Sequence, residues 1–589
     1  MSNKLYTSIP APKVPRNNFD RSRPNSLTLQ FQRVCPTMVE EILPGDLFRV
    51  GTETFARLQP LIAPVMNNMK ISQHFFFVPL RTLNKHFAEF MFNNRTGDYS
   101  EVLPYTTTAQ IYGMIDTLSD EGDDILAAEC IRLFDYIGLP FKYSSAVSAS
   151  AFVSAWLADT WNIAVSESAK RVNLAPFFAY QKIWSEYFRD ENVEEDPFVV
   201  FEDLASESVF DWTGNVTSKL TNVVVDFCSC FFRLRPRAWA HDRFTSSLPF
   251  AQRGPDVLLP IAGTAEVKYK DGYLLEQREN YAQAVVLGAG QTPSENKAQL
   301  AWGSLANGQA RVFRSEQTGY NASANVAAFD PNGSLYTDFD DASLTTTINA
   351  FRRAERLQRW YENSARGGVR PNEATLAHFG VRTPDATLDR AEFLGGSMQP
   401  IVVSEVAQTS QTTSGEGGSP QGTLAGKGTS YKGQFAFKSF FTEHGFVFCF
   451  TSALVRANYW QGIPKVFSRM QRDEYYWPEF ANLGEEPVFT KELYAPTQNE
   501  DDVFGYVPRY SDYKSAVGEV HGDMRSSLAF WTQAREFSNT PRLNKEFLFG
   551  DAPLTPFAVQ SQYTDPIIAT IQFSVKASRL MPFYGVPTI

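Results

Sequence analysis

The sequence contains few cysteines and few histidines, and neither type is grouped as a metal site or a disulfide framework would require. Its 589 residues include five cysteines, an odd and sparse set that indicates folding in a reducing compartment. Cys228 and Cys230 lie two positions apart, which would place both on one face of a buried strand. The six histidines are isolated from one another, and no HExxH or other zinc spacing occurs. We therefore expect no metal ion and no cofactor.

Long apolar runs are also missing. No run reaches the ~18 residues that indicate a membrane helix. The N-terminal stretch MSNKLYTSIPAPKVPRNNF lacks the apolar segment of a signal peptide. These absences predict a soluble protein with no membrane partner.

An excess of positive charge is absent as well. The formal net charge is −11 at pH 7, whereas neutralising phosphates requires a basic surface. The chain alone is therefore not expected to coat a nucleic acid, and any nucleic-acid contact must be local.

The composition is that of a large folded protein. Hydrophobic residues make up 43% and charged residues 20% of the chain, which is typical of a globular protein. Its length exceeds the ~250–300 residues that one core can hold. The 34 prolines and 36 glycines are spread along the chain, which favours many short strands with elaborate loops. Aromatic residues reach 14%, which fits either a large core or large protein interfaces.

The stretch ISQHFFFVPLRTL at 71–83 contains three consecutive phenylalanines, Phe75, Phe76 and Phe77. A strand with one solvated face alternates apolar and polar residues, because successive side chains point to opposite faces. This segment begins to alternate and then becomes apolar on both faces. We expect a barrel core to cover one face, and inserted elements or neighbouring chains to cover the other.

Strand-like patterns occur towards both ends of the chain. Strands are expected within 27–79, 220–240, 434–441, 444–456 and 567–580. Residues 81–211 are mixed and include helical patterns such as FFAYQKIWSEYFRDEN, whose apolar residues recur at helical spacing.

The middle of the chain is more polar. The stretch 265–345 has the sparse apolar pattern of a surface excursion, and 404–430 is expected to be a polar loop. Between them, a helix is expected from Thr347, which can cap it, to Gly367 and Gly368, which stop it.

The first 26 residues predict an extended basic arm that cannot bury a core. Its basic residues are Lys4, Lys13, Arg16, Arg21 and Arg23, with Asp20 as the one acid. Two interpretations remain open, a frayed terminus and an arm that lies along something acidic or along neighbouring subunits.

No segment carries a recognisable catalytic motif. GTLAGKGTS at 422–430 fails as a phosphate-binding loop, because Gln421 and Gly428 stand where that motif requires Gly and Ser or Thr. No G-x-S-x-G elbow marks a nucleophilic serine. Asp501 and Asp502 could bind a cation, but a hydrated loop is the simpler interpretation. We expect no catalytic residues and no enzymatic activity.

Several longer blocks occur in a characteristic order. They are PGD (44–46), RLQPLIAPVMNNMKISQHFFFVPLRTL (57–83), YQKIWSEYFRDEN (180–192), HDRFTSSLPFAQRG (241–254), TINAFRRAERLQRWYENSARGGVR (347–370), HFGVRTPDATLDRAEFLGG (378–396), SPQGTLAGKG (419–428), EHGFVFCF (443–450), DEYYWPEFANLGEEPV (473–488) and FGYVPRYSDYKSAVGEVHGDMRSSLAFW (504–531). Over most of the chain these blocks resemble the major capsid protein of the Microviridae, small tailless phages with single-stranded DNA, and they are closest to the gokushovirus branch. Two residues depart from the family pattern: Arg243 replaces a usual Tyr, and Pro371 replaces an aromatic residue.

The resemblance implies a mainly β fold, a single eight-stranded antiparallel jelly-roll barrel with long helical and loop insertions, assembled into the simplest (T=1) icosahedral shell. The expected parts are a basic extended arm (1–26), the first part of the jelly roll with helical insertions at about 84–211 (27–260), a surface insertion and candidate threefold protrusion (261–346), a helix with long loops (347–430), and the C-terminal part of the jelly roll (431–589). The protein would be located in the virion, and in the host bacterial cytoplasm during assembly.

Shell assembly implies particular partners. The subunit would contact its own copies, and the inner face would contact a circular single-stranded DNA genome. Candidate DNA contacts are Lys4, Lys13, Arg16, Arg21, Arg23, Arg233, Arg235 and Arg237, with Trp239 available for stacking on bases. Because the chain is acidic, a small basic DNA-binding virion protein is also implied. Minor pilot or spike-type virion proteins and a host surface receptor, met by the protrusion, complete the expected partners.

Two other classes of function compete with this interpretation. A non-viral jelly-roll binding module, such as a lectin, would be a monomer or small oligomer with a compact ligand pocket. A glycoside hydrolase would require a pair of carboxylates, and no spacing in the sequence identifies one.

Overall fold

The computed structural model of the chain describes residues 15–92, 102–216, 219–220, 222–255, 348–407 and 424–584, with short strands between 267 and 337 and the single residues 257, 409 and 422. The chain forms two compact units, which are described separately. One consists of Met1–Arg253 together with Glu362–Ile589, and the other of Gly254–Tyr361.

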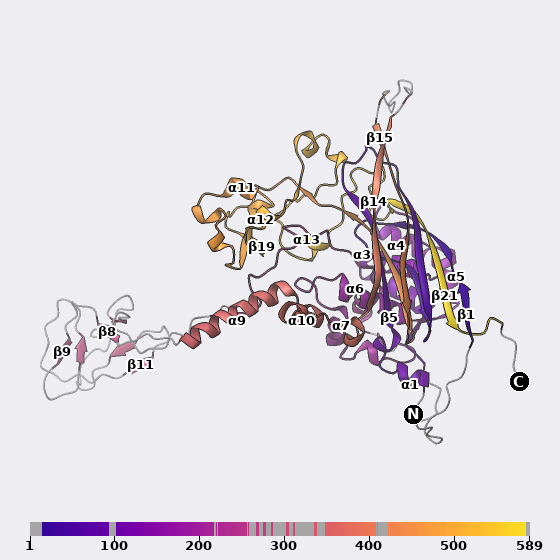
Figure 1. The fold of residues 1–589 in the computed structure, drawn as a ribbon, viewed down its shortest axis with the longest axis horizontal. Coiled ribbons are helices and arrows are strands. Elements are labelled where there is room, and N and C mark those ends of the chain that lie inside the picture. Colours follow the sequence, from indigo (N-terminus) through magenta and orange to yellow (C-terminus); the bar gives the residue numbers. More distant parts are fainter. Residues whose placement is uncertain are drawn as a thin grey trace, which may run out of the picture. The chain divides into compact units, whose positions relative to one another are not determined.

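The larger unit is organised around an antiparallel sheet with the strand order β1-β21-β4-β15-β14-β5-β16-β3, and β2 also pairs with β21 (Figure 1). Its strands are β1 (Arg16–Asp20), β2 (Arg23–Leu29), β3 (Cys35–Ile42), β4 (Leu47–Leu58), β5 (Met69–Pro79), β14 (Glu392–Ala407), β15 (Leu424–Phe440), β16 (Gly445–Val455) and β21 (Ile567–Leu580). The strands expected near Leu27–Pro79 and in the C-terminal part are thus confirmed, and so is the mainly β class.

The sheet curls around a core of its own. Inward-facing residues from both halves of the strand order pack together, including Phe48 of β4, Phe573 of β21, Phe75 of β5 and Cys449 of β16. Strands that are distant in the order therefore face each other across this core. The result is a curled half-barrel.

The end of the predicted arm is part of the sheet. Arg16–Asp20 pairs with Lys576–Leu580, and Arg23–Leu29 pairs with Ile567–Phe573 of the same strand. The described portion of the predicted arm is thus extended and lies along the sheet of its own subunit, because backbone pairing with a neighbouring strand does not require apolar side chains. Residues 1–14 lie outside the described residues.

The three phenylalanines of β5 answer the question that their sequence raises. Phe75 and Phe77 face the half-barrel core. Phe76 and Val78 point to the other face, where they join a cluster formed largely by helices. Phe76 lies with its ring centroid 4.7 Å from that of Tyr187 and 5.8 Å from that of Phe450. The chain's own insertion therefore covers the second face of the strand.

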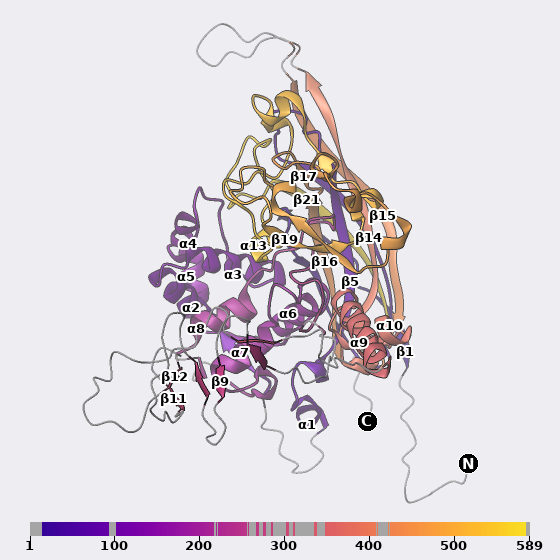
Figure 2. The same cartoon turned by 90° about the vertical axis from the view of Figure 1, so that its left-hand side faces the viewer.

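The helices gather on one side of the sheet (Figure 2). They are α1 (Phe87–Phe92), α2 (Thr108–Asp120), α3 (Asp124–Ile137), α4 (Ala149–Leu157), α5 (Thr160–Glu167), α6 (Ala175–Tyr187), α7 (Pro197–Ala205) and α8 (Val224–Phe227). The short strands β6 (Tyr105–Thr107) and β7 (Arg171–Asn173), which precede α2 and follow α5, pair antiparallel with each other. Thr107 caps α2 through a capping box with Gln110, and Gly138, with φ 103°, ends α3 in the left-handed region that favours glycine. Local sequence therefore defines where these helices begin and end.

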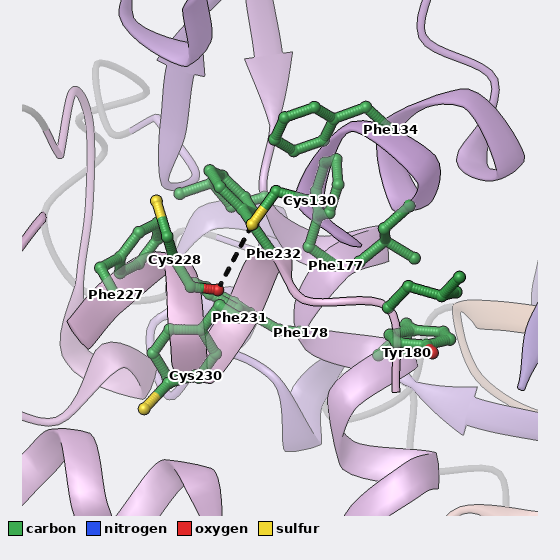
Figure 3. Close-up of a cluster of buried hydrophobic side chains, with 14 of the residues drawn as sticks. Cys130, Phe134, Phe177, Phe178, Tyr180, Phe227, Cys228, Cys230, Phe231 and Phe232 are labelled. Atoms are coloured by element: carbon green, nitrogen blue, oxygen red, sulfur yellow. Dashed lines mark hydrogen bonds between the residues drawn. The ribbon is translucent and has the colours of Figure 1, made fainter. Parts of the chain in front are cut away.

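Within the segment 220–240, where a strand was predicted, residues 224–232 are helical and residues 233–240 are irregular apart from an isolated bridge at Pro236. Helix α8 continues into a π-helical turn, Cys228–Phe232 (Figure 3). In this turn, residues two positions apart point in different directions. Phe227 and Phe231, four residues apart, lie with ring centroids 5.2 Å apart and both pack against Phe201. An apolar run that is buried on all sides has no period that distinguishes a helix from a strand.

The two cysteines of this turn are buried, as predicted, but on different sides. Figure 3 shows their sulfurs pointing in different directions, and the Cys130 thiol donates to the Cys228 carbonyl across 3.9 Å. The prediction that Cys228 and Cys230 share one strand face is wrong, because a helix rotates residues that are two positions apart away from each other.

The polar stretch 404–430 is partly a hairpin. Val402–Ala407 of β14 pairs with Leu424–Thr429 of β15, so the prediction of a loop is wrong for 404–407 and 424–430. The two strands pair mainly with each other there, and their backbone hydrogen bonds need no apolar side chains. Most of 408–423 lies outside the described residues.

Between β16 and β21 the chain forms a lobe of short elements. These are β17 (Asn458–Tyr459), α11 (Lys465–Ser468), β18 (Glu485–Phe489), β19 (Val503–Pro508), α12 (Ser511–Lys514), β20 (Gly518–Glu519) and α13 (Lys545–Phe549). Phe504 and Phe547 from this lobe pack in a third core with Met69, Ile71 and Ile567 of the sheet.

Among its described residues, the smaller unit contains three antiparallel two-stranded pairs. Its strands are β8 (Val267–Tyr269), β9 (Leu275–Gln277), β10 (Ala284–Val286), β11 (Trp302–Ser304), β12 (Ala310–Val312) and β13 (Leu335–Thr337). Strand β9 pairs with β10, β11 with β12, and β8 with β13. Most of the predicted surface insertion, 261–346, lies outside the described residues, so its role as a protrusion remains a prediction. The expected helix is α9 (Ile348–Gly367), which continues from this unit into the larger one, where α10 (Pro371–Phe379) follows.

Candidate interaction surfaces

The arginines next to the N-terminus are engaged within the subunit. Arg21 and Arg23 both form ion pairs with Glu40, whose side chain is 1% exposed. Arg16 donates hydrogen bonds to the carbonyls of Ser578 (3.0 Å) and Gly45 (2.7 Å), and its guanidinium lies 6.0 Å from the ring of Phe440. Arg21 and Arg23 thus neutralise a buried carboxylate. Lys4 and Lys13 lie outside the described residues.

The basic trio after the π-helical turn is largely interior. Arg233 pairs with Glu129, and Arg235 donates to the Gln181 amide oxygen and to the Cys230 carbonyl, each at 2.7 Å. The Arg235 guanidinium also lies over the Trp184 ring at 4.5 Å. These contacts join α6 to the turn that contains Cys230.

Arg237 and Trp239 continue this pattern. Arg237 donates to the hydroxyl of Ser72 on β5 at 2.6 Å, and burial lowers the pKa of Arg237 to about 10. Trp239 is 2% exposed and its indole N–H donates to the Gly550 carbonyl at 2.8 Å. In the folded subunit Arg235 and Trp239 offer almost no surface to a nucleic acid, and DNA contact by these residues remains a prediction.

A half-open cavity of about 480 Å³ lies beside the trio and is lined by charged groups from several elements. The charges are already paired: Arg33 lies 2.7 Å from Asp551 and 3.6 Å from Glu129. Arg132, also on the lining, forms an ion pair with Asp565 in which both side chains are under 5% exposed. Arg33 and Arg132 are therefore already paired with carboxylates of the subunit itself.

A dense apolar surface lies on the lobe between β16 and β21. We define the 463–483 patch as the segment containing Ile463, Val466, Phe467, Met470, Tyr475, Tyr476, Trp477, Phe480 and Leu483, all at least 38% exposed. Phe467 is 72% and Met470 is 82% exposed. Nine large exposed side chains within 21 residues exceed what scattered surface residues account for, and a concentration of this kind indicates a contact site in soluble proteins.

Buried ion pairs hold this patch in place. Lys465 pairs with Glu486 at 2.9 Å, with side chains that are 15% and 9% exposed. Arg469 pairs with Asp512, and its guanidinium lies 4.3 Å from the ring centre of Tyr513. The segment is therefore a preformed surface, which lowers the entropic cost of binding a partner. Sequence reasoning missed it, although the run Tyr475–Trp477 is an aromatic cluster that could have indicated it.

Both residues that depart from the family pattern have clear local roles. Arg243 lies 2.7 Å from Glu492, and the two side chains are 7% and 2% exposed. Burial raises the pKa of the Glu492 carboxyl, and the neighbouring Arg243 opposes that shift. Pro371 is the first residue of α10, where its missing N–H has no cost.

Neither a metal cluster nor a membrane span is found in the described part of the chain. No three His, Cys, Asp or Glu side chains there are grouped to hold an ion. None of the helices within the described ranges combines the length and the apolar composition needed to cross a bilayer.

Comparison with known proteins assigns the family. A family model described as "Capsid protein (F protein)" matches residues 7–114 and 147–589. The chain belongs to this capsid protein family. It is 30% identical to capsid protein VP1 of Chlamydia phage 1 (99% of this chain, 97% of the relative) and 30% identical to capsid protein VP1 of Bdellovibrio phage phiMH2K (99% and 97%). Capsid protein VP1 of Spiroplasma virus 4 is 26% identical, over 98% of this chain and 95% of the relative.

These matches confirm the resemblance to Microviridae capsid proteins that was inferred from the sequence blocks. The protein is a major capsid protein of a phage, a component of the virion, and its copies assemble into a shell that encloses a single-stranded DNA genome. The lectin and glycoside hydrolase alternatives are not supported, since the capsid matches cover almost the whole chain.

Proposed function

We propose that the subunit is a jelly roll and that it builds a T=1 icosahedral shell around a circular single-stranded DNA. The strand order supports the fold. One half of the sheet has the order β2-β21-β4-β15 and the other β14-β5-β16-β3, with every pair antiparallel. Two four-stranded halves connected by long crossings are the arrangement of an eight-stranded jelly roll.

The 463–483 patch is the surface that we assign to contact between subunits. It is the densest group of exposed large apolar side chains in the lobe, and ion pairs hold it in one conformation. Closed shells require heterologous contacts between unlike surfaces of neighbouring copies. We assign the patch to one of the contacts between neighbouring subunits.

Replacing Phe467 and Met470 together by aspartate tests this assignment. Both side chains are exposed in the single subunit, so its melting temperature is expected to change little. Particles should be lost, as measured by size-exclusion chromatography and negative-stain microscopy.

A matched double variant on α7, Val199→Asp with Leu204→Asp, places the same charges on side chains that are 56% and 52% exposed. It is expected to form particles. Normal particles from the 463–483 variant, or equal loss from both variants, would contradict the assignment.

The genome and the minor partners remain proposals. The arm residues that we propose for DNA contact are Lys4, Lys13 and Arg16, which is exposed although it donates to two backbone carbonyls. Arg21, Arg23 and Arg233 are instead held in ion pairs with carboxylates, and Arg235, Arg237 and Trp239 in interior contacts. With a net charge of −11, the chain needs a small basic virion protein to neutralise the genome. Particles stripped of that protein should bind DNA weakly and lose binding as salt rises; tight, salt-resistant binding would contradict this.

We also propose that the chain acts only as a structural protein. A receptor contact through the 261–346 insertion, and association with minor pilot or spike-type proteins, would be made from the assembled shell. Deleting that insertion should abolish attachment to host cells while particles still form; unchanged attachment would exclude the receptor role.

A further inference from the structure

The half of the sheet formed by β2, β21, β4 and β15 has an outer face that the described residues leave uncovered. Along β21, positions 568, 570, 572, 574 and 576 are exposed, and the alternate positions are buried in the cores. Along β4, positions 49, 53, 55 and 57 are exposed in the same way. Figure 2 places the helices α2–α8 on the other side of the molecule from β14, β15 and β1. We call this surface the bare sheet face.

Three cations form a row across the bare sheet face. Arg49 of β4 lies directly opposite Lys438 of β15 on one side and Lys576 of β21 on the other. All three side chains are exposed. Residues directly opposite each other on antiparallel strands point to the same face, and strands are ~4.8 Å apart, so the backbones of the three residues lie within about 10 Å. We call these residues the cation row.

The row is unfavourable for the isolated fold. Like charges placed directly opposite each other destabilise a sheet. The one acid in line with the row is Asp20, opposite Lys576 on β1. A feature that opposes folding and is fully solvated is best explained by an anionic partner.

The wider face has the same sign of charge. Arg16, Arg57 and Lys427 also occupy outward positions, which brings the bare sheet face to six basic residues against two acidic ones, Asp20 and Glu53. The surplus is local, because the whole chain carries a net charge of −11. The positive charge is therefore specific to this surface and does not reflect the composition of the whole chain.

Aromatic rings stand between the cations. Tyr431, Phe435 and Phe440 of β15 are 70%, 60% and 56% exposed, and Phe55 lies opposite Tyr431 on β4 at 39%. The guanidinium of Arg49 lies 5.6 Å from the ring centre of Phe435, and that of Arg57 lies 4.9 Å from the ring centre of Phe55. Exposed aromatic rings interleaved with basic residues are the pattern on which single-stranded nucleic acids bind, with bases stacked and phosphates neutralised.

We propose that the bare sheet face is a binding surface for single-stranded DNA, with the cation row contacting phosphates and Tyr431 and Phe435 stacking on bases. The proposal rests on the capsid function, and it assigns the bare sheet face to the inner surface of the shell. The acidic surface of a sister subunit is the competing occupant. DNA is favoured because rings and charges alternate here, whereas the 463–483 patch presents its apolar side chains together.

The position of the N-terminus agrees with this assignment. β1 is the edge strand of the same half of the sheet, and Arg16 reaches from it to the ring of Phe440. The basic residues Lys4 and Lys13 precede this strand in the chain. The described chain therefore begins at the edge of the bare sheet face.

The test compares two charge-matched triple variants of the full-length chain. One is Arg49→Gln, Lys438→Gln and Lys576→Gln; the control is Lys70→Gln, Lys170→Gln and Lys514→Gln, which removes three exposed charges elsewhere. Fluorescence anisotropy with a labelled 20-nucleotide oligo(dT) measures affinity over a range of salt concentrations. Losing three phosphate contacts should lower the slope of log K against log salt by about 2, and weaken binding ~100-fold at 0.1 M salt.

The aromatic contribution is tested by Tyr431→Ser, with Phe379→Ser, 79% exposed on α10, as its control. Losing one base stack should weaken binding about tenfold at all salt concentrations, without changing the slope. The control should leave the affinity unchanged.

Particle formation, followed by negative-stain microscopy, separates this proposal from the capsid function. Normal particles with reduced DNA affinity and reduced DNA content would support it. Equal effects of the two triple variants, or unchanged DNA affinity in the cation-row variant, would overturn it and leave the shell function intact. Loss of particles with unchanged DNA affinity would overturn it in favour of a sister subunit as the occupant.

Discussion

Replacing Phe76 by alanine is expected to destabilise the subunit as strongly as replacing Phe75, although the two side chains lie on opposite faces of β5. Phe76 is 2% exposed, and its ring centroid lies between 4.7 and 5.9 Å from those of Tyr187, Phe393, Phe450 and Phe188. Truncating a buried phenylalanine to alanine costs about 3–5 kcal/mol in lost burial and cavity formation. The four ring contacts place Phe76→Ala towards the upper end of this range.

The free energy of unfolding of unassembled subunits, measured by urea denaturation, checks this expectation. Phe75→Ala should cost a similar amount, because Phe75 is fully buried in the half-barrel core. Phe55→Ala, on the bare sheet face, is the matched control and should cost less than ~1 kcal/mol.

A cost below about 1 kcal/mol for Phe76→Ala, together with a large cost for Phe75→Ala, would refute the reasoning. The outer face of β5 would then be solvated, and the helices would not cover the sheet as described.

Three further predictions concern buried polar groups. Burial, with a contribution from Arg237, lowers the pKa of His74 from 6.5 to about 4. As the pH falls, His74 is therefore protonated in the unfolded chain at a higher pH than in the folded chain. The contribution of neutral His74 to the free energy of unfolding is fully present above pH 6.5, and the free energy should fall by up to ~3 kcal/mol towards pH 4. His74→Gln should remove this slope in urea titrations between pH 4 and 6.5, whereas His521→Gln, at an exposed site, should keep it. Asp565→Asn should cost about 3–5 kcal/mol by leaving Arg132 buried without its charge partner, and replacing both by Leu and Met should recover much of the loss; equal losses would contradict the pairing. All five cysteines are buried, so a thiol reagent should label them only after denaturant is added; fast labelling of native subunits would contradict this.

Much of the sheet could be predicted from the sequence because its strands carry local signals. The alternation in β4 and β21 corresponds to the observed burial at most positions, although Phe55 and Ile568 are exposed, and the apolar run of β5 is buried on both faces as expected. The helix from residue 348 was predicted from its spacing and its glycine stop, and it ends at Gly367. The segment 220–240 was predicted wrongly because it is apolar in every direction, so no period was visible.

The interaction surfaces were harder to predict than the fold. The trio Arg233, Arg235 and Arg237 has the composition of a nucleic-acid site, but its side chains are occupied by Glu129, Gln181 and Ser72. A sequence pattern counts charges and does not show their partners. The 463–483 patch was missed because the sequence likewise does not show what surrounds an apolar side chain. Apolar residues in a loop can lie in a core or on a surface.

By itself the sequence determined the family, the mainly β class, the positions of most strands and the need for something to cover both faces of β5. Only the tertiary structure decided what that cover is and which basic residues are free of buried ion pairs. The cation row joins Arg49, Lys438 and Lys576 through strand register. The local pattern of apolar residues sets which face each side chain occupies, but which strands become neighbours is decided by the packing of segments hundreds of residues apart.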